Sequence, residues 1–391
     1  MVLDRFALFD APRDQLLLVA VGCLALMGLV MVTSASLQIA ETRLGSPFYY
    51  ALRHGFFLGM AVMAGATVYL FVPFSLLEKL RYPALFASLV VLALVLMPGI
   101  GREVNGSQRW ISLAGFNVQP SELAKLGFIV YLAGYINERQ QELREQWQGF
   151  LRPLGLLSVL VLLLLMEPDF GAVVVLGVAV MGMLFLGGVP TLRFLLVGLA
   201  AVMLAALVAV AQPYRVARLM SFLDPWADQF GGGYQLTQSL IAFGRGHWTG
   251  AGLGNSVQKL FYLPEAHTDF VFAVSAEELG LLGSMIMVSL FALVCWRIFR
   301  SAIAMLEAGD LFRGQVVLGI GLVLAGQAFI NMGVNMGLLP TKGLTLPFVS
   351  YGGSSLVVCA VMLGLVLRAQ REFEPASPRR RPAGTARRRR A

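Results

Sequence analysis

Ten apolar runs, each close to the length that crosses a bilayer, constrain the fold of this chain more than any other feature. A membrane helix needs roughly 17–25 mostly apolar residues, and the 391-residue chain is 58% hydrophobic and only 13% charged. Backbone polar groups inside a bilayer must be satisfied internally, so runs of this kind fold as helices. The runs cover about 16–36, 52–72, 83–98, 121–136, 152–166, 170–188, 191–211, 270–298, 314–339 and 351–369. We therefore predict an all-α polytopic membrane protein with about ten transmembrane helices and no strands.

The distribution of lysine and arginine predicts the orientation of the chain. An even number of spans puts both termini on one side, and the side with more Lys and Arg is the cytoplasmic one. We expect a cytoplasmic N-terminus over 1–15, a transmembrane domain over 16–369 and a disordered, basic cytoplasmic tail over 370–391. The Pro/Arg-rich tail cannot bury apolar surface and holds most of the net charge of +8. It is typical of a topology anchor that touches anionic lipid headgroups. Docking to a cytoplasmic protein partner is the alternative. Nucleic-acid binding is not expected, because no aromatic residues or folded nucleic-acid-binding element accompany the charge.

The cysteines and histidines predict neither a disulfide nor a zinc site. Cys23, Cys295 and Cys359 all fall within predicted spans, where cysteine acts as a small apolar filler. His247 and His267 lack metal-ligand spacing to each other or to cysteine. We expect no structural metal.

The connection over 212–268 is the only long polar segment between spans, and the orientation places it outside the cytoplasm. Residues 234–243 have helical spacing with one apolar side, which predicts a short interfacial helix. Arg245 and Lys259 are candidates for contact with an anion. A transporter has no need of such a loop, whereas an enzyme that works on a lipid headgroup does.

The loop closes in the sequence LPEAHTDF, which places Asp269 at the start of the eighth span, with Glu265 and His267 beside it. The sequence leaves two roles possible for Asp269, a helix cap and a catalytic carboxylate. An aspartate at this position can accept a backbone N–H bond, and it can also face the mouth of a cavity. A helix N-terminus lowers the pKa of a carboxyl group, so Glu265 or apolar surroundings must raise it again if Asp269 is to act as a base.

Two further elements carry polar groups at the ends of spans. In QPSELAK, Pro120 and Ser121 form a natural helix opening with Ser121 as N-cap. Glu122 and Lys125 are three residues apart, so they lie on one helix face and can pair; ionisable groups within a span are functional by default, and the alternative is an ion pair that locks two helices together. In EPDFG, Asp169 is predicted to cap the next helix in a structural turn, with cation binding as the alternative.

The run over 331–355 departs most from an ordinary span. It reads NMGVNMGLLPTKGLTLPFVSYGGSS and breaks at Pro340 and Pro347. Polar, bent backbone at membrane depth is tolerated only when it is buried in protein or lines a wet cavity. A binding site is therefore the first hypothesis for this run, with Lys342 and Ser350 as candidates.

Four elements in order, RW…QPSELAK, EPDFG, GLGNSVQKLFYLPEAHTDF and LLPTKGLTLPFVSYGGSS, resemble the SEDS family (shape, elongation, division and sporulation). The resemblance covers roughly residues 15–370. These are bacterial membrane proteins that polymerise peptidoglycan glycan strands. The GLGNS stretch and Ala266 are more similar to the cell-division (FtsW) branch than to the elongation (RodA) branch.

The resemblance implies a peptidoglycan glycosyltransferase of the inner membrane at the division septum, acting on lipid II. Asp269 would be the general base, and undecaprenyl diphosphate would leave, stabilised by cationic side chains or by a divalent cation such as Mg or Mn. Arg109 or Lys125 would neutralise the diphosphate and Trp110 would stack on sugar or lipid. The implied partners are a class B penicillin-binding protein (a transpeptidase) and divisome regulators. The candidate substrate-binding residues are Arg109, Trp110, Gln119, Glu122, Lys125, Arg245, Lys259, Glu265, His267, Lys342 and Ser350.

Two other functions stay open. A lipid II flippase or transporter would suit ten spans with an intramembrane ion pair. A non-catalytic scaffold that recruits the transpeptidase would need no catalytic carboxylate.

Overall fold

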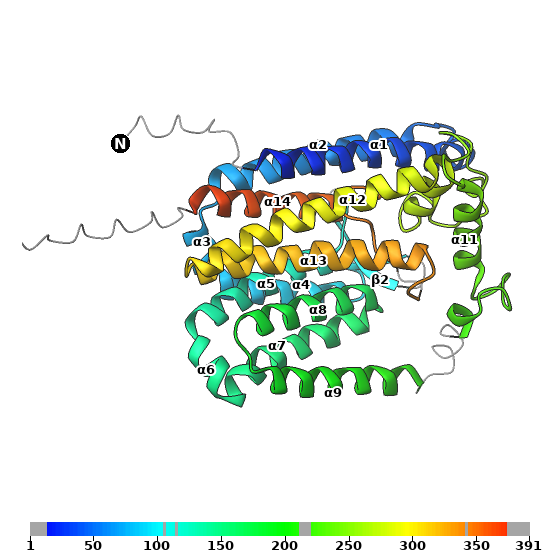
Figure 1. Cartoon of the computed structure of the whole chain (residues 1–391). Coiled ribbons are helices and arrows are strands. Elements are labelled where there is room, and N and C mark those ends of the chain that lie inside the picture. Colours follow the sequence, from blue (N-terminus) through cyan, green and yellow to red (C-terminus); the bar gives the residue numbers. More distant parts are fainter. Residues whose placement is uncertain (1–13, 105–106, 114–115, 211–219, 341–342, 374–391) are drawn as a thin grey trace, which may run out of the picture.

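The computed structural model describes residues 14–104, 107–113, 116–210, 220–340 and 343–373, and these form a bundle of long helices that lie roughly along one common axis (Figure 1). The elements are α1 Gln15–Leu44, α2 Tyr49–Phe71, α3 Phe74–Lys79, α4 Arg81–Val95, β1 Gly101–Val104, β2 Ser107–Leu113, β3 Phe116–Val118, α5 Pro120–Glu138, α6 Gln140–Glu145, α7 Trp147–Met166, α8 Phe170–Leu186, α9 Thr191–Val210, α11 Tyr234–Gly246, α12 Val271–Glu307, α13 Leu311–Asn335 and α14 Gly353–Glu372.

Each of the ten predicted apolar runs overlaps a helix, so the helical polytopic class is confirmed. In the described part of the chain, α1, α2, α7, α12, α13 and α14 are long and apolar enough to cross a membrane. Helices α4 and α8 and the first part of α9 are shorter apolar helices. Helix α5 carries Glu122 and Lys125 among its apolar residues. The exact count of ten crossings stays a prediction.

The expectation of no strands is wrong. Strands β1, β2 and β3 form a small antiparallel sheet in that order between α4 and α5. Arg102 lies opposite Trp110, and Ile111 lies opposite Val118. Valine, isoleucine and tryptophan suit a pleated, half-buried surface, but strands this short give too little alternation for a prediction. The sheet matters because β2 carries Arg109.

Two helix boundaries differ from the prediction. Helix α13 ends at Asn335, four residues early, and Gly337 then adopts a left-handed φ of 72° that turns the chain. Helix α14 continues to Glu372, into the segment assigned to the tail, because Arg368 pairs with Glu372 one turn later at 2.6 Å.

Helices α5 and α13 are the most enclosed elements, and α13 contacts α5, α8 and α12. Small residues permit this packing. A Cβ atom on Gly319 would lie 2.6 Å from both Ile129 of α5 and Met183 of α8. Close approach of this kind is how helices associate in membranes. The centre of the bundle is therefore tightly packed, and we expect a functional site at one of its two ends.

The predicted helix in the long loop is confirmed as α11. It lies across one end of the bundle rather than along it (Figure 1). The hydroxyl of Ser239 on α11 donates to the carbonyl of Asn335 at the end of α13, at 2.7 Å. The long loop is thus attached to the same end of the bundle as the start of α12. The predicted position of α11 at the membrane interface stays a prediction.

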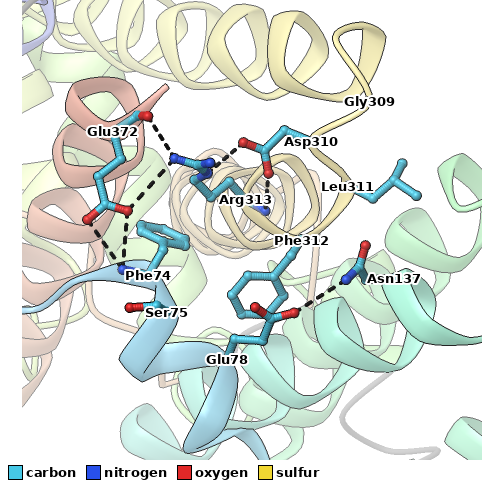
Figure 2. Close-up of a pocket in the computed structure, with 10 residues that line it drawn as sticks. All are labelled: Phe74, Ser75, Glu78, Asn137, Gly309, Asp310, Leu311, Phe312, Arg313 and Glu372. Atoms are coloured by element: carbon cyan, nitrogen blue, oxygen red, sulfur yellow. Dashed lines mark hydrogen bonds and ion pairs between the residues drawn. The ribbon is translucent and has the colours of Figure 1, made fainter. Parts of the chain in front are cut away.

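The opposite end of the bundle holds a cavity of about 330 Å³ among α3, the α12–α13 connection and the end of α14 (Figure 2). Three of its charged groups interact with one another, and the fourth, Glu78, accepts from the side-chain amide of Asn137 at 3.4 Å. Arg313 pairs with Asp310 at 2.5 Å and lies 3.8 Å from Glu372, which also accepts from the backbone N–H of Phe74.

Candidate active site at the entrance to α12

Asp269 lies just before α12, but it does not cap the helix. The N-cap residue is Phe270, whose side chain forms no hydrogen bond to the first turn of the helix. Among the described residues, none forms a hydrogen bond or ion pair with the Asp269 carboxylate. The side chain is partly exposed. The cap alternative for Asp269 is therefore wrong, and its carboxyl group is available for another role.

Gly343 lies close to both the carboxyl group of Asp269 and the guanidinium of Arg109, although these two groups form no ion pair. A Cβ atom on Gly343 would lie 3.2 Å from Oδ2 of Asp269 and 3.9 Å from Nη1 of Arg109. Glycine lets a backbone segment approach functional groups this closely. Three elements far apart in sequence, namely β2, the start of α12 and the 343–352 loop, thus converge at one point.

Arg109 is held in place by the turn between α7 and α8. Its Nε donates to the carbonyl of Glu167 at 3.1 Å, and its Nη2 donates to the carbonyl of Pro168 at 2.7 Å. The guanidinium is a planar, rigid fork, so two fixed donors also fix the direction of Nη1. That third nitrogen lies toward Gly343 and Asp269.

Asp169 ties two of the sequence elements together. It caps α8 as predicted, accepting from the N–H of Ala172 at 3.2 Å. Its other oxygen accepts from the Ser121 hydroxyl at 2.9 Å and from the side-chain amide of Gln119 at 3.1 Å. The N–H of Gln119 donates to Ser354 of the closing run. The elements QPSE, EPDFG and SYGGSS are therefore joined in one hydrogen-bond network near Asp269.

The prediction of Ser121 as an N-cap is wrong. Gln119 occupies the N-cap position without a side-chain bond to the helix, and Pro120 is the first helical residue. Ser121 donates to Asp169 instead. A tertiary partner has replaced the local one.

Electrostatics around Asp269 suit a general base. Burial raises the pKa of the Asp269 carboxyl to about 7; the negative charges of Glu265 and Asp169 add to the rise, while Arg109 opposes it. Both sources of the rise anticipated from sequence, apolar surroundings and Glu265, are present. Burial also lowers the pKa of His267, so its neutral form is favoured.

Glu167 is a second carboxyl group of the same kind. It is fully buried, and neither of its carboxyl oxygens has a hydrogen-bond partner among the described residues. Burial raises its pKa to about 8, with a further contribution from Asp169 and opposition from Arg109. It is thus held in its neutral form at neutral pH.

Glu122 and Lys125 form the predicted ion pair, at 2.9 Å and almost without exposure. Gln327 of α13 bridges them, accepting from Lys125 at 3.2 Å and donating to Glu122 at 3.4 Å. This arrangement fits the helix-locking alternative, because it joins α5 to α13. A substrate role for either residue stays a prediction.

Arg245 and Lys259 are engaged with α12. Lys259 pairs with Glu278 at 2.7 Å and bonds the Ser34 hydroxyl at 2.8 Å. Arg245 pairs with Glu277 at 3.0 Å. These bonds fasten the long loop to the bundle, and anion contact by either cation stays a prediction.

The remaining candidates have varied surroundings. Trp110 is half-buried on β2, and His267 lies against the ring of Tyr50, with 4.8 Å between ring centroids. The Ser350 hydroxyl accepts from the N–H of Leu346 at 2.9 Å, which makes it part of a turn. Lys342 lies outside the described residues.

No group of three or more His, Cys, Asp or Glu that could hold a metal ion occurs among the described residues. Cys23 is exposed on α1, unlike the filler role predicted for it, whereas Cys359 is buried.

Sequence reasoning missed three residues of the site. Asn331 and Asn335 bond the backbone of Asp269 at 2.9 and 3.0 Å, and Glu167 lies beneath Arg109. The spacing of the two asparagines, one helical turn, places both amides on one face, and this could have revealed them. Glu167 lies in EPDFG two residues before Asp169, where the sequence offered cation binding as the alternative, and nothing local predicted its contact with Arg109.

The fold and the site define a polytopic membrane protein with a carboxyl–guanidinium site at one end of its helix bundle. The family model described as "Cell cycle protein", which covers FtsW, RodA and SpoVE, matches residues 14–374. The chain belongs to this family, as the sequence motifs predicted.

Among curated relatives, the "Probable peptidoglycan glycosyltransferase FtsW" of Alcanivorax borkumensis is 64% identical over 370 residues, covering 95% of this chain and 96% of the relative. The protein of the same name from Pseudomonas fluorescens is 54% identical over 353 residues, with coverage of 90% and 86%. The FtsW-type assignment is thereby confirmed.

Solved structures agree with this assignment. A chain from a study described as "Structural coordination of polymerization and crosslinking by a peptidoglycan synthase complex" matches with a TM-score of 0.75 and 32% identity, over 91% of this chain and 96% of that one. The rod shape determining protein RodA of Thermus thermophilus matches with a TM-score of 0.69 and 30% identity, over 95% and 99%.

Proposed function

We propose that this chain, a peptidoglycan glycosyltransferase of the FtsW type, polymerises lipid II into β-1,4 glycan strands with Asp269 as its general base. The observation that carries the proposal is the Asp269 carboxyl group itself. Asp269 is half-buried, its carboxyl group has no bonding partner among the described residues, and burial raises the pKa of that group to about 7. A base with a pKa near the working pH transfers protons efficiently.

In the proposed reaction, Asp269 takes the proton of the acceptor GlcNAc 4-hydroxyl as that oxygen attacks C1 of the donor MurNAc. The new bond joins C1 to the acceptor oxygen, and the bond from C1 to the phosphate oxygen breaks. The electron pair of the broken bond leaves with undecaprenyl diphosphate. One displacement converts an α-linked donor into a β-linked product, so no covalent enzyme intermediate is needed.

Arg109 is assigned to the leaving group. A fixed guanidinium stabilises negative charge that develops on phosphate oxygens. Nη1 of Arg109 and the carboxyl group of Asp269 both lie next to Gly343. A divalent cation (Mg or Mn) would supply similar stabilisation. Asp169 and Asp269 are suitable oxygen donors, but Asp169 already accepts three hydrogen bonds, so no step is assigned to a metal.

The multi-pass membrane setting fits a lipid-linked donor, which reaches the site laterally. We place both termini in the cytoplasm and α11 with Asp269 on the outer face, at the division septum. A solved relative comes from a complex that couples polymerisation to crosslinking, which supports a class B penicillin-binding protein as the transpeptidase partner. Divisome regulators and membrane lipid complete the proposed set of partners.

The test is polymerisation of labelled lipid II by the purified protein together with its transpeptidase partner. Asp269→Asn keeps the size of the side chain but cannot accept the proton, and we expect a loss of at least about 100-fold in rate with lipid II binding retained. Asp228→Asn is the matched control, since it makes the same change at an exposed carboxylate of the same loop.

The two other functions predict different outcomes. If the protein is a flippase, Asp269→Asn impairs lipid translocation while polymerisation in the same membranes continues. If it is a scaffold, a stable and correctly localised Asp269→Asn protein supports growth. Full polymerisation by the Asp269→Asn protein rejects the proposed mechanism.

A further inference from the structure

We infer that Asn331 and Asn335 of α13 are positioning residues of the polymerase site, which hold the backbone of Asp269 and replace the cap that Asp269 would otherwise give to α12. The inference rests on the proposed function, because it assumes that Asp269 is the base. It assigns a role to two buried residues that act through the backbone of Asp269.

Asn331 joins the two segments that meet at the site. Its side-chain amide donates to the carbonyl of Asp269 at 2.9 Å and to the carbonyl of Leu344 at 2.6 Å. Leu344 directly follows Gly343, which lies close to the carboxyl of Asp269 and to Arg109. One NH₂ group therefore sets the spacing between the entrance to α12 and the 343–352 loop.

Asn335 forms two hydrogen bonds with the start of α12. Its amide NH₂ donates to the carbonyl of Asp269 at 3.0 Å, and its Oδ1 accepts from the N–H of Ala273 at 3.1 Å. The first N–H groups of a helix lack partners within the regular helical pattern, and α12 has no capping side chain of its own. Asn335 supplies a side-chain cap from a neighbouring helix, and it shares the N–H of Ala273 with the backbone carbonyl of Phe270, 3.0 Å away.

This tertiary cap explains how an aspartate can stand at a helix entrance and remain uncommitted. An aspartate beside a helix start ordinarily bonds the exposed N–H groups, which would hold its carboxyl ionised. With the N–H of Ala273 bonded to Asn335, the carboxyl of Asp269 is left to face Gly343 and Arg109.

Asparagine is the side chain that fits both positions. Both residues are almost fully buried, and the group that faces the two backbone carbonyls must be a donor, which excludes aspartate and leucine. The acceptor oxygen of Asn331 has no partner among the described residues. That unpaired oxygen costs stability, so the value of Asn331 to the protein lies in its donor.

The charged and titratable groups around Asp269 set the direction of the pH effect. Glu265 and His267 precede it on the same segment, Asp169 faces it from the α7–α8 turn, and Arg109 faces it from β2. If the asparagine bonds are lost, the entrance to α12 loosens and Asp269 moves toward water. Its pKa then falls toward the ordinary value, so the acid limb of the activity profile moves to lower pH while the maximal rate drops.

The test compares Asn331→Leu and Asn335→Leu with Gln315→Leu, in the full-length protein with its transpeptidase partner and labelled lipid II. Gln315 is also a buried amide on α13, and it has no bond to the Asp269 segment. We expect both asparagine variants to lose on the order of 100-fold in kcat, as for a misplaced catalytic group, with KM little changed and with the acid limb shifted to lower pH. The Oε1 atom of Gln315 has no partner among the described residues, so Gln315→Leu should leave both kcat and the acid limb unchanged.

Asn335→Asp separates the cap on the N–H of Ala273 from the bond to the carbonyl of Asp269. It keeps an oxygen that accepts from Ala273, and in its ionised form it has no donor for the carbonyl of Asp269. We expect it to fold and still to lose kcat, and it carries the test if the leucine variants do not accumulate. If Asn335→Asp has the kcat and pH profile of the unaltered protein, or if the leucine variants behave like Gln315→Leu, the inference is wrong. An active Asp269→Asn protein would instead reject the proposed function.

Discussion

The two ends of the helix bundle differ in the carboxyl groups that they leave without a partner. At the end that contains α3 and the C-terminus of α14, Arg297 pairs with Asp14 at 2.9 Å and Arg368 pairs with Glu372 at 2.6 Å. The end with the entrance to α12 also holds two ion pairs, Arg245–Glu277 and Lys259–Glu278. Asp269 and Glu167 at that end have no such partner among the described residues, and both have a raised pKa.

This contrast separates stability from chemistry. A carboxylate whose charge is matched holds elements together, whereas one kept near neutral pKa without a partner can exchange a proton, and such groups gather at functional sites. The cavity at the end that contains α3 is bordered by groups that satisfy one another (Figure 2), so we assign it no ligand. Removing Arg109 should therefore reduce activity, whereas removing Arg297 should reduce stability.

Removing Arg109 should have the largest effect. We expect Arg109→Leu to lower kcat/KM by about 10²–10³, as for the loss of one fixed donor to a developing charge. Arg109 lowers the pKa of Asp269, so its loss also moves the acid limb to higher pH. Arg109→Lys keeps the charge but not the fork, and should lie between. Initial rates of lipid II polymerisation across pH provide the measurement, and an unchanged acid limb in Arg109→Leu would contradict this prediction.

The unaltered enzyme should lose activity in acid. The base must be ionised to accept a proton, and burial raises the pKa of Asp269 to about 7. Below that value, kcat/KM should fall about tenfold for each pH unit, because the protonated fraction of Asp269 grows by that factor. Rates from pH 5.5 to 8.5, with enzyme stability checked at each pH, provide the measurement. A flat profile would show that Asp269 does not limit the reaction.

At the end that contains α3, Arg297→Met should destabilise the protein and leave the polymerisation rate per folded molecule unchanged. It strands the buried carboxylate of Asp14, and breaking a buried pair costs about 3–5 kcal/mol; Arg297 is 24% exposed, which favours the lower limit. Arg300→Met is the matched control, because both arginines lie over Trp296 but Arg300 has no carboxylate partner among the described residues. Thermal unfolding in detergent distinguishes the two.

The smallest effect concerns Glu167 and the pH dependence of stability. Its folded pKa of about 8 lies above the ordinary value of 4.5, so the folded state holds the proton more tightly than the unfolded state does. Stability is then fully present below the ordinary value and is lost as pH rises toward 8. Asp269 contributes the same sign only up to about 7.

Between pH 7 and 8 the loss should therefore come from Glu167, at no more than about 1.4 kcal/mol for that unit. Glu167→Gln should abolish it, and Asp269→Asn should not. Unfolding temperatures at the two pH values test this, and an equal slope in the protein with Glu167→Gln would exclude Glu167 as the source.

Local patterns predicted the elements well and the contacts poorly. The apolar runs located the helices, the spacing of Glu122 and Lys125 predicted their pair, and Asp169 caps α8 as its turn suggested. Each of these depends on neighbours within a few residues. The cap expected at Ser121 is wrong because Asp169, 48 residues away, binds the hydroxyl instead.

The amino-acid sequence by itself determined a helical membrane protein, the polar elements at the ends of its spans and, through motif resemblance, its family. Hydrophobic length and residue identity are local properties, so they can be read along the chain. Only the tertiary structure decided that Asn335 caps α12 in place of Asp269, and that Arg109, Gly343 and the Asp269 carboxyl lie close together. Those contacts join segments separated by tens to hundreds of residues, and the pKa of Asp269 depends on burial and on the charges of Arg109 and Asp169, which are also distant in sequence.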